Sequence, residues 1–500
     1  MITDKASRVI AKYLADYAEP EASATTFILK ESSFDIALIL PCYDEAVAKV
    51  KSILAHNASY RVLFIVVVNA PDNATPSAIK TTQELYRALA SYPPLPGATL
   101  QLADAQQVKT DKSQVGKVSL HTVPNSCHGL MLVDRVNVAR IPAKQGVGLA
   151  RKIGADLALK LFDQGFLING WLGSTDADAK LPADYFDTLK SLDQKVPPFA
   201  GAVFGFNHVC IDNRLHDAAN LYDLSLRYYV DALAWCGSPY AFATIGSCLA
   251  FHLVAYAQVR GFPKRAGGED FYLLNKLCKL KLTTSMEPSR TATAFPASKI
   301  TSGILPLDKC VIALEARESH RVPFGTGPAI TKILMQTHPV DDYLFYHPRI
   351  FVLLRVWLLT MHRAWPGVAK GSAVDANWWR CLDDVVTIIA EDSPGGDFTK
   401  LTAKEQQVLR GWGEESGWYE ALRHCLRQSG GSEAFISQLH TWFDGFRTLK
   451  FVHYIRQHLY PSLPAKELLH LTEMLPDDFR NTVLAEFRKR LYASTKHDEN

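Results

Sequence analysis

Two pairs of acids are the residues best suited to chemistry. Asp176 and Asp178 lie two apart in the run STDADA, and Glu269 and Asp270 follow two glycines in GGED. Carboxylates two apart in an extended segment point the same way, and hard oxygen ligands suit Mg²⁺ or Mn²⁺ shared with substrate phosphates. Each pair also has a plainer interpretation, a solvated turn for the first and a helix cap for the second. In the functional interpretation Asp270 is a general base that deprotonates an acceptor hydroxyl.

Two basic segments are candidates for binding phosphate. Lys144 and Arg151 lie in KQGVGLAR at the start of an expected helix, where glycines and cations form an anion site. The spacing is not that of a P-loop. Arg317 and Arg321 precede a Gly/Pro-rich run that ends at Pro328. That segment either closes over a diphosphate and neutralises a leaving group or is an inter-domain linker.

The elements around these residues alternate between short apolar strands and helices, which is typical of an α/β sheet. Continuous apolar runs suit parallel strands that are covered on both faces, and such sheets bind ligands at the carboxyl ends of their strands. STDADA follows one of these strands. We expect a helical extension at 1–33, an α/β domain at 34–328 with a polar insertion loop at 92–128, and a mostly α-helical C-terminal domain at 329–500.

The order of the motifs is more specific than any single motif. PCYDE follows the first strand and NAPD the second, and GVGLARKIG, STDADA and GGED come after them. This series resembles the family 2 glycosyltransferases of the GT-A fold, over about residues 34–328. The resemblance implies a GT-A-type nucleotide-diphospho-sugar-binding domain with a mainly parallel sheet. It also implies inverting transfer of a sugar from a nucleotide-diphosphate sugar to an acceptor hydroxyl, with Mn²⁺ or Mg²⁺ as cofactor.

The same resemblance assigns donor-side residues by position. Pro41, Tyr43 and Glu45 would line the nucleotide pocket, and Asn69 and Asp72 would lie near the base or ribose. Lys144 and Arg151 would face the diphosphate, and Asp176 and Asp178 would hold donor and metal. Arg317 and Arg321, from the basic segment described above, are further candidates for donor binding.

On the acceptor side, Gly246 and Ser247 match a small-residue segment, Glu269 would orient the acceptor and Asp270 would be the base. Three positions depart from the family pattern. Asp44 replaces the usual Asn, and Asn69 stands where an Asp is common. No histidine clearly matches a third metal ligand; the candidate is His320, with His252 a poorer one.

Three other functions compete with this interpretation. A nucleotidyltransferase should carry a glycine-rich loop with Arg and Lys after the first strand, and PCYDE disfavours it. A retaining transferase would not need Asp270 as base. A non-catalytic sugar-nucleotide sensor or scaffold would use the helical domain and its tryptophans to bind a partner, although aromatic residues at helical spacing are more often core.

Composition narrows the class of protein and its partners. With 48% hydrophobic and 21% charged residues, the 500-residue chain is globular and long enough for about two domains. A net charge of +3 disfavours a general nucleic-acid binder. Nine cysteines without a CxxC pair indicate neither a zinc site nor a disulfide framework, so we expect a cytoplasmic protein.

The longest apolar run, 350–361, contains Arg355 and is too short to span a bilayer. It is either a buried helix or a peripheral membrane contact. The acceptor stays open between a glycan, a metabolite and a lipid-linked molecule.

Overall fold

The computed structural model describes residues 3–29, 33–102, 115–194, 199–210, 212–280, 282–286, 298–318, 325–368, 374–391, 401–471 and 475–495. The chain divides into two compact units. Unit 1 comprises Met1–Ile211, Thr244–Leu280 and Gly303–Pro328, and unit 2 comprises Asp212–Ala243, Lys281–Ser302 and Ala329–Asn500.

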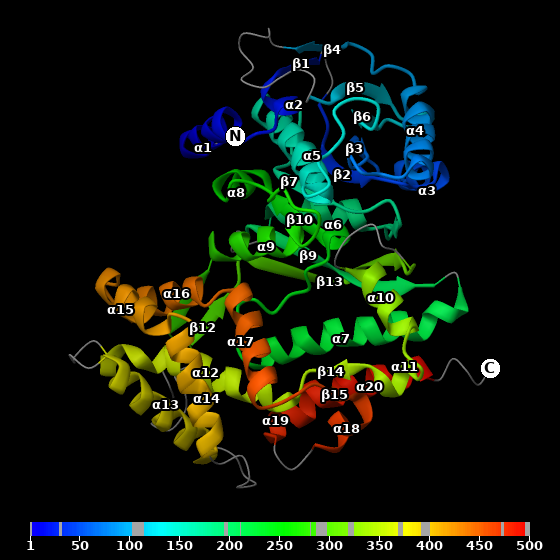
Figure 1. Ribbon diagram of the computed structural model, residues 1–500. Helices are drawn as coiled ribbons and strands as arrows, with labels where there is room; N and C mark the ends of the chain where they lie inside the picture. The colour runs from blue at the N-terminus through cyan, green and yellow to red at the C-terminus, as the bar shows by residue number, and fades with distance from the viewer. Residues whose placement is uncertain are drawn as a thin grey trace. The chain divides into compact units, whose positions relative to one another are not determined.

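Unit 1 is built on a nine-stranded sheet with the strand order β5-β6-β3-β2-β7-β10-β9-β13-β8 (Figure 1). Its strands are β2 (Ile36–Cys42), β3 (Val62–Asn69), β5 (Lys117–Thr122), β6 (Gly129–Arg135), β7 (Trp171–Ser174), β8 (Ala179–Lys180), β9 (Gly201–Val209), β10 (Leu249–His252) and β13 (Ile304–Glu315). The pairs β6–β3, β3–β2, β2–β7 and β9–β13 are parallel, and the other four are antiparallel. The expected α/β sheet is therefore present. The parallel character is confirmed in part: β6, β3, β2, β7, β9 and β13 run in one direction, whereas β5, β10 and β8 run in the opposite direction.

The central strands are covered on both faces, as their continuous apolar sequences predict. All residues of β2 and β3 are buried. A Cβ built on Gly154, in helix α5 (Gly146–Asp163), would lie 2.6 Å from Ile39, which places α5 against one face. A Cβ on Gly173 would meet both Leu38 and Tyr185, so helix α6 (Tyr185–Ser191) lies on the other face.

The remaining helices of unit 1 are α1 (Asp4–Asp16), α2 (Pro20–Ser23), α3 (Val47–Leu54), α4 (Pro76–Ala90), α8 (Leu253–Gln258) and α9 (Glu269–Leu280). Helix α1 packs on α5 and α8. The segment 92–128, expected as an insertion loop, contains two strands in its described part. β4 (Ala98–Leu102) pairs with β1 (Thr25–Leu29), and β5 is an edge strand of the main sheet in which Lys117 is exposed and Leu120 and His121 are buried.

Unit 2 is mostly helical. Its elements are α7 (His216–Trp235), β11 (Thr283–Met286), β12 (Ser298–Thr301), α10 (Thr326–Leu334, which begins in unit 1), α11 (Pro339–Asp342), β14 (Leu344–Phe345), α12 (Pro348–Val368), α13 (Val374–Glu391), α14 (Ala403–Glu415), α15 (Trp418–Gln428), α16 (Ser432–Trp442), α17 (Gly445–His458), β15 (Leu463–Pro464), α18 (Ala465–His470), α19 (Asp477–Phe479) and α20 (Ala485–Thr495). Helix α7 groups here rather than within 34–328, because its Tyr228 packs on Phe351 and Phe487 and its Asp231 pairs with Arg490.

Three tryptophans of unit 2 form an aromatic core. Trp357, Trp378 and Trp418 are fully buried, with ring centroids 4.7–5.2 Å apart. Ile350–Leu354 in α12 are also fully buried, in line with the buried-helix interpretation of 350–361. In the described part of the chain, no helix combines the length and the apolar character needed to cross a membrane.

Candidate functional site

The site lies where the carboxyl ends of β2, β7 and β13 meet. β2 and β7 are parallel neighbours, and β9 has the direction of β7 because β10 is antiparallel to both. β13 is parallel to β9, so all these strands end at the same edge of the sheet. The segments that follow them carry PCYDE, STDADA and Arg317.

Arg317 links the ends of β2 and β7. Its guanidinium donates to both carboxylate oxygens of Glu45, at 3.1 and 2.5 Å, and one of its nitrogens lies 2.8 Å from Asp178. Glu45 is buried, whereas the side chains of Asp178 and Arg317 are 19% and 27% exposed. Beside them, Pro41 is buried in β2 and Tyr43 is half-buried after it. A ligand can therefore reach this ion cluster.

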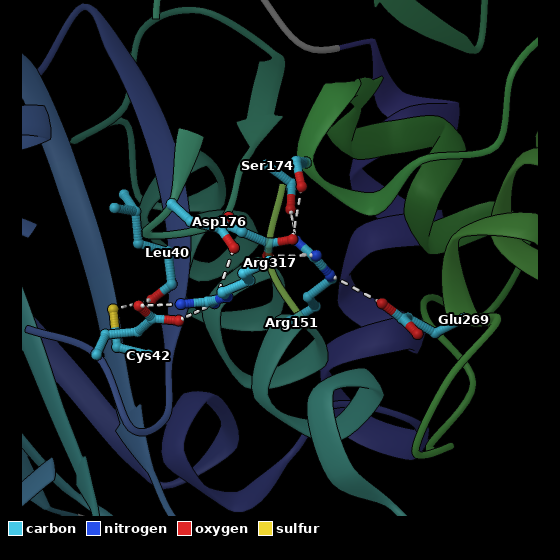
Figure 2. Close-up of polar contacts among 10 residues, drawn as sticks. Leu40, Cys42, Arg151, Ser174, Asp176, Glu269 and Arg317 are labelled. Carbon is cyan, nitrogen blue, oxygen red and sulfur yellow. Dashed lines mark hydrogen bonds and ion pairs between the residues drawn. The ribbon is translucent and has the colours of Figure 1, made fainter. Parts of the chain in front are cut away.

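Arg151, from α5, holds the other half of the site (Figure 2). Nε donates to Glu269 at 2.9 Å, Nη1 to the Ser174 hydroxyl at 2.6 Å, and Nη2 to Asp176 at 2.6 Å. The second oxygen of Asp176 accepts a hydrogen bond from Ser247 at 2.6 Å. STDADA, GGED and the segment around Gly246, which are far apart in the sequence, thus meet around one guanidinium.

The site carries more negative than positive charge. Burial and the charge of Asp176 raise the pKa of Asp178 to about 7, although Arg317 opposes this. Burial also raises the pKa of Glu45. Burial is the largest cause of both shifts because it disfavours the charged form of a carboxyl group, whereas a nearby cation favours that form. A further cation at this edge of the sheet would offset the excess.

The donor set fits a hard divalent ion. Carboxylate oxygens of Asp176 and Asp178 are the ligands that Mg²⁺ and Mn²⁺ prefer. Among the described residues, no group of three or more His, Cys, Asp and Glu side chains is arranged to hold a metal. Substrate phosphates would have to complete such a coordination shell.

Asp270 lies at the start of α9, and its pKa is raised. It is the second residue of α9, partly buried, and its carboxylate accepts a hydrogen bond from the Phe271 amide at 2.7 Å. Burial and the charge of Glu269 raise its pKa to about 7, close to the value that serves a base at neutral pH. The amide contact is also what the helix-cap interpretation expects, so the geometry accommodates both.

The glycines before Arg151 serve close packing rather than an open anion site. The Gly148 amide donates to the Arg265 carbonyl at 2.9 Å, and a Cβ on Gly148 would lie 2.5 Å from the Pro263 carbonyl oxygen. The start of α5 is thus covered by the segment before GGED. Lys144 is exposed at this end of the helix, and its role toward a donor stays a prediction.

Two other predicted donor residues make local structural contacts. Asn69 is buried and donates to the carbonyls of Cys42 and Val67, at 3.2 and 3.1 Å, which ties β3 to β2. Asp72 accepts from the Ala143 amide at 3.1 Å. Contact with a base or ribose stays a prediction for both residues.

His320 and Arg321 lie outside the described residues. His252 is at the wrong end of the sheet for a metal ligand, since β10 is antiparallel to β7 and pairs His252 with Trp171 rather than with Ser174. Its Nδ1 accepts from the Val254 amide and caps α8.

Sequence analysis missed three contributors. Ser174 binds Arg151, and Lys49 pairs with Glu315 at 2.7 Å beside the cluster. No local sequence pattern links Lys49 to Glu315, because the two residues are 266 positions apart and meet only in the folded chain.

Comparisons with known proteins add little. No protein-family model matches the chain, and no match was found among curated proteins. Among solved structures, the chain is similar to residues 1–349 of S. aureus TarS in complex with UDP-GlcNAc, at 10% identity and a TM-score of 0.30. A second structure of the same TarS fragment matches at 9% identity and a TM-score of 0.28. Both alignments cover 82% of this chain and 90% of the TarS chain. Because these TM-scores are so low, function must be argued from the site.

Proposed function

We propose that this protein is a GT-A-type glycosyltransferase, which moves a sugar from a nucleotide-diphosphate donor to an acceptor hydroxyl with inversion. One observation carries the proposal. The acid pair expected to hold the donor and the acid pair expected to supply the base come from distant parts of the sequence and meet through Arg151. Their order along the chain is the order in which the family 2 glycosyltransferases carry them.

The residues divide into a donor side and an acceptor side. Asp176 and Asp178 face the donor diphosphate, where a bound Mn²⁺ or Mg²⁺ would neutralise charge on the phosphates. Arg317 stabilises the negative charge that develops on the leaving diphosphate. Pro41 and Tyr43 line the nucleotide pocket at the end of β2.

Asp270 performs the proton transfer. The acceptor hydroxyl oxygen forms a bond to the anomeric carbon while the bond from that carbon to the diphosphate oxygen breaks. The hydroxyl proton passes to the Asp270 carboxylate, and the electron pair of the broken bond stays on the diphosphate. Glu269, fixed by Arg151, orients the acceptor.

A panel of sugar nucleotides, each with Mn²⁺ and a mixture of glycan and metabolite acceptors, tests the proposal through release of nucleoside diphosphate. We expect release with one donor class, and loss of release in Asp176→Ala and Asp270→Ala. NMR of the product anomer then separates inversion from retention. A sensor or scaffold would bind a sugar nucleotide without releasing diphosphate, and that outcome would refute the enzymatic function.

A further inference from the structure

Arg151 is a buried cation whose donors are divided among three partners. Its side chain is 2% exposed, and Nε, Nη1 and Nη2 donate to Glu269, Ser174 and Asp176 respectively (Figure 2). These partners belong to α9, to β7 and to the segment after β7. One planar group therefore fixes the distance between the acids of STDADA and GGED.

The surroundings of Arg151 are built for this position. A Cβ on Gly246 would lie 2.5 Å from Nη2, so a larger residue at this position would push the guanidinium away from its partners. The next residue, Ser247, binds the other oxygen of Asp176 at 2.6 Å. Asp176 is thus held from two sides, and its side chain still keeps 34% exposure for a ligand.

Arg151 and Arg317 differ in how much of each side chain is exposed to solvent. A phosphate that arrives from solvent can reach the 27% exposed side chain of Arg317 but not the 2% exposed side chain of Arg151. The charges of Asp176 and Glu269 outweigh burial and raise the pKa of Arg151 above its ordinary value, so it is charged at all working pH values. It separates two carboxylates that would otherwise repel each other.

Resting on the glycosyltransferase function proposed above, we infer that Arg151 is a positioning residue and not a phosphate ligand. It acts through Glu269: by fixing Glu269 against Asp176, it sets where the first turn of α9, and with it Asp270, lies relative to the donor. Glu269 and Arg151 then act as one unit in turnover.

A ligand-free measurement tests the physical link. Amide hydrogen exchange of the peptide 267–274 reports the start of α9, where the Tyr272 amide bonds to the Gly268 carbonyl. We expect Arg151→Gln and Glu269→Gln each to speed this exchange about tenfold, and the double variant to exceed neither single variant. Lys152→Met is the matched control, because Lys152 is an equally buried cation on the same helix that pairs with Asp156. Unchanged exchange in Arg151→Gln, or an equal rise in Lys152→Met, would overturn the inference.

The functional arm uses steady-state turnover with the donor found in the panel. We expect Arg151→Gln to lower kcat about 100-fold with a change in donor KM under about threefold, and Glu269→Gln to add no further loss in the Arg151→Gln background. A phosphate ligand would instead raise KM, and independent residues would give multiplicative losses. Arg151→Lys serves if Arg151→Gln does not fold: one ammonium keeps the charge but cannot span three partners, so kcat should recover only in part. If no donor turns over in the wild type, the proposed function fails while the exchange arm still decides the link.

Discussion

Two neighbouring residues of α5, Arg151 and Lys152, are both buried cations in carboxylate clusters, yet the clusters differ in whether they are complete. Asp156 beside Lys152 is fully buried. Its first oxygen accepts from the hydroxyls of Tyr13 and Tyr256, at 2.7 and 2.8 Å. Its second accepts from Lys152 at 2.9 Å and from the Glu19 amide at 2.7 Å.

The cluster around Asp156 is closed: four donors saturate one carboxylate, and the result ties α1 and α8 to α5. The cluster around Arg151 is open. Acids from three segments share Arg151 and Arg317. The pKa of Asp178 and that of Asp270 are raised to about 7, and the side chain of Asp176 is 34% exposed. We interpret the buried, charge-balanced cluster around Asp156 as structural. We interpret the excess of acidic residues around Arg151, at an exposed edge of the sheet, as a binding place for a cation and a substrate.

The largest effect is expected in the open cluster at Asp270. Asp270→Asn removes the proton acceptor and keeps the shape, so kcat should fall about 10²–10⁴-fold while donor affinity changes little. Turnover assays together with calorimetry of donor binding measure the two quantities. Unchanged kcat would leave Asp270 as a helix cap and would favour a retaining mechanism.

The closed cluster should respond in stability instead. Asp156→Ala leaves Lys152 buried without its nearest carboxylate partner, which should cost about 3–5 kcal/mol of unfolding free energy. Asp176→Asn, at a partly exposed position, keeps an oxygen that can accept from Arg151 and leaves Glu269 in place, so it should cost less, about 1–3 kcal/mol. Chemical unfolding followed by circular dichroism compares the two. Equal losses would contradict the division into closed and open clusters.

Acid should slow the proposed sugar transfer through the open cluster. The pKa of Asp270 is raised to about 7 by burial and by the charge of Glu269, and the base works in its ionised form. kcat should therefore rise as pH increases through 7 and fall about tenfold for each pH unit below it. Glu269→Gln removes a neighbouring negative charge and should move this midpoint to lower pH. A pH profile that is flat across this range would speak against Asp270 as the base.

The smallest effect is expected at the rim of the site. The ion pair between Lys49 and Glu315 is 31% and 22% exposed at its two side chains, so Lys49→Met should change the unfolding free energy by under about 1 kcal/mol. It should also leave metal-dependent nucleotide binding in place. A loss of binding as large as that of Asp176→Ala would show that Lys49 belongs to the donor site itself.

Local sequence patterns predicted most elements but not their grouping. The expected short apolar strands are found as β2 and β3, and the helix expected at KQGVGLAR is found as α5. The antiparallel entry of β10 and the packing of α7 with α20 depend on contacts between distant segments, which no window of sequence contains.

The site shows the same division. STDADA and GGED were visible as acids at the ends of elements. The role of Arg151 was not visible, because the sequence GVGLAR resembles an anion-binding helix start. In the fold the Arg265 carbonyl accepts from the Gly148 amide and covers this helix start. Ser174 and Glu315 look like ordinary strand residues, and only the sheet order brings them to the cluster.

The most direct test of the open cluster is thermal unfolding with a panel of nucleoside diphosphates, with and without Mn²⁺. A ligand that binds the native state raises the unfolding midpoint by mass action. We predict a Mn²⁺-dependent rise with one nucleotide that is kept in Lys49→Met and lost in Asp176→Ala. No rise with any nucleotide, or the same rise in Asp176→Ala, would contradict the assignment of this cluster as the donor site.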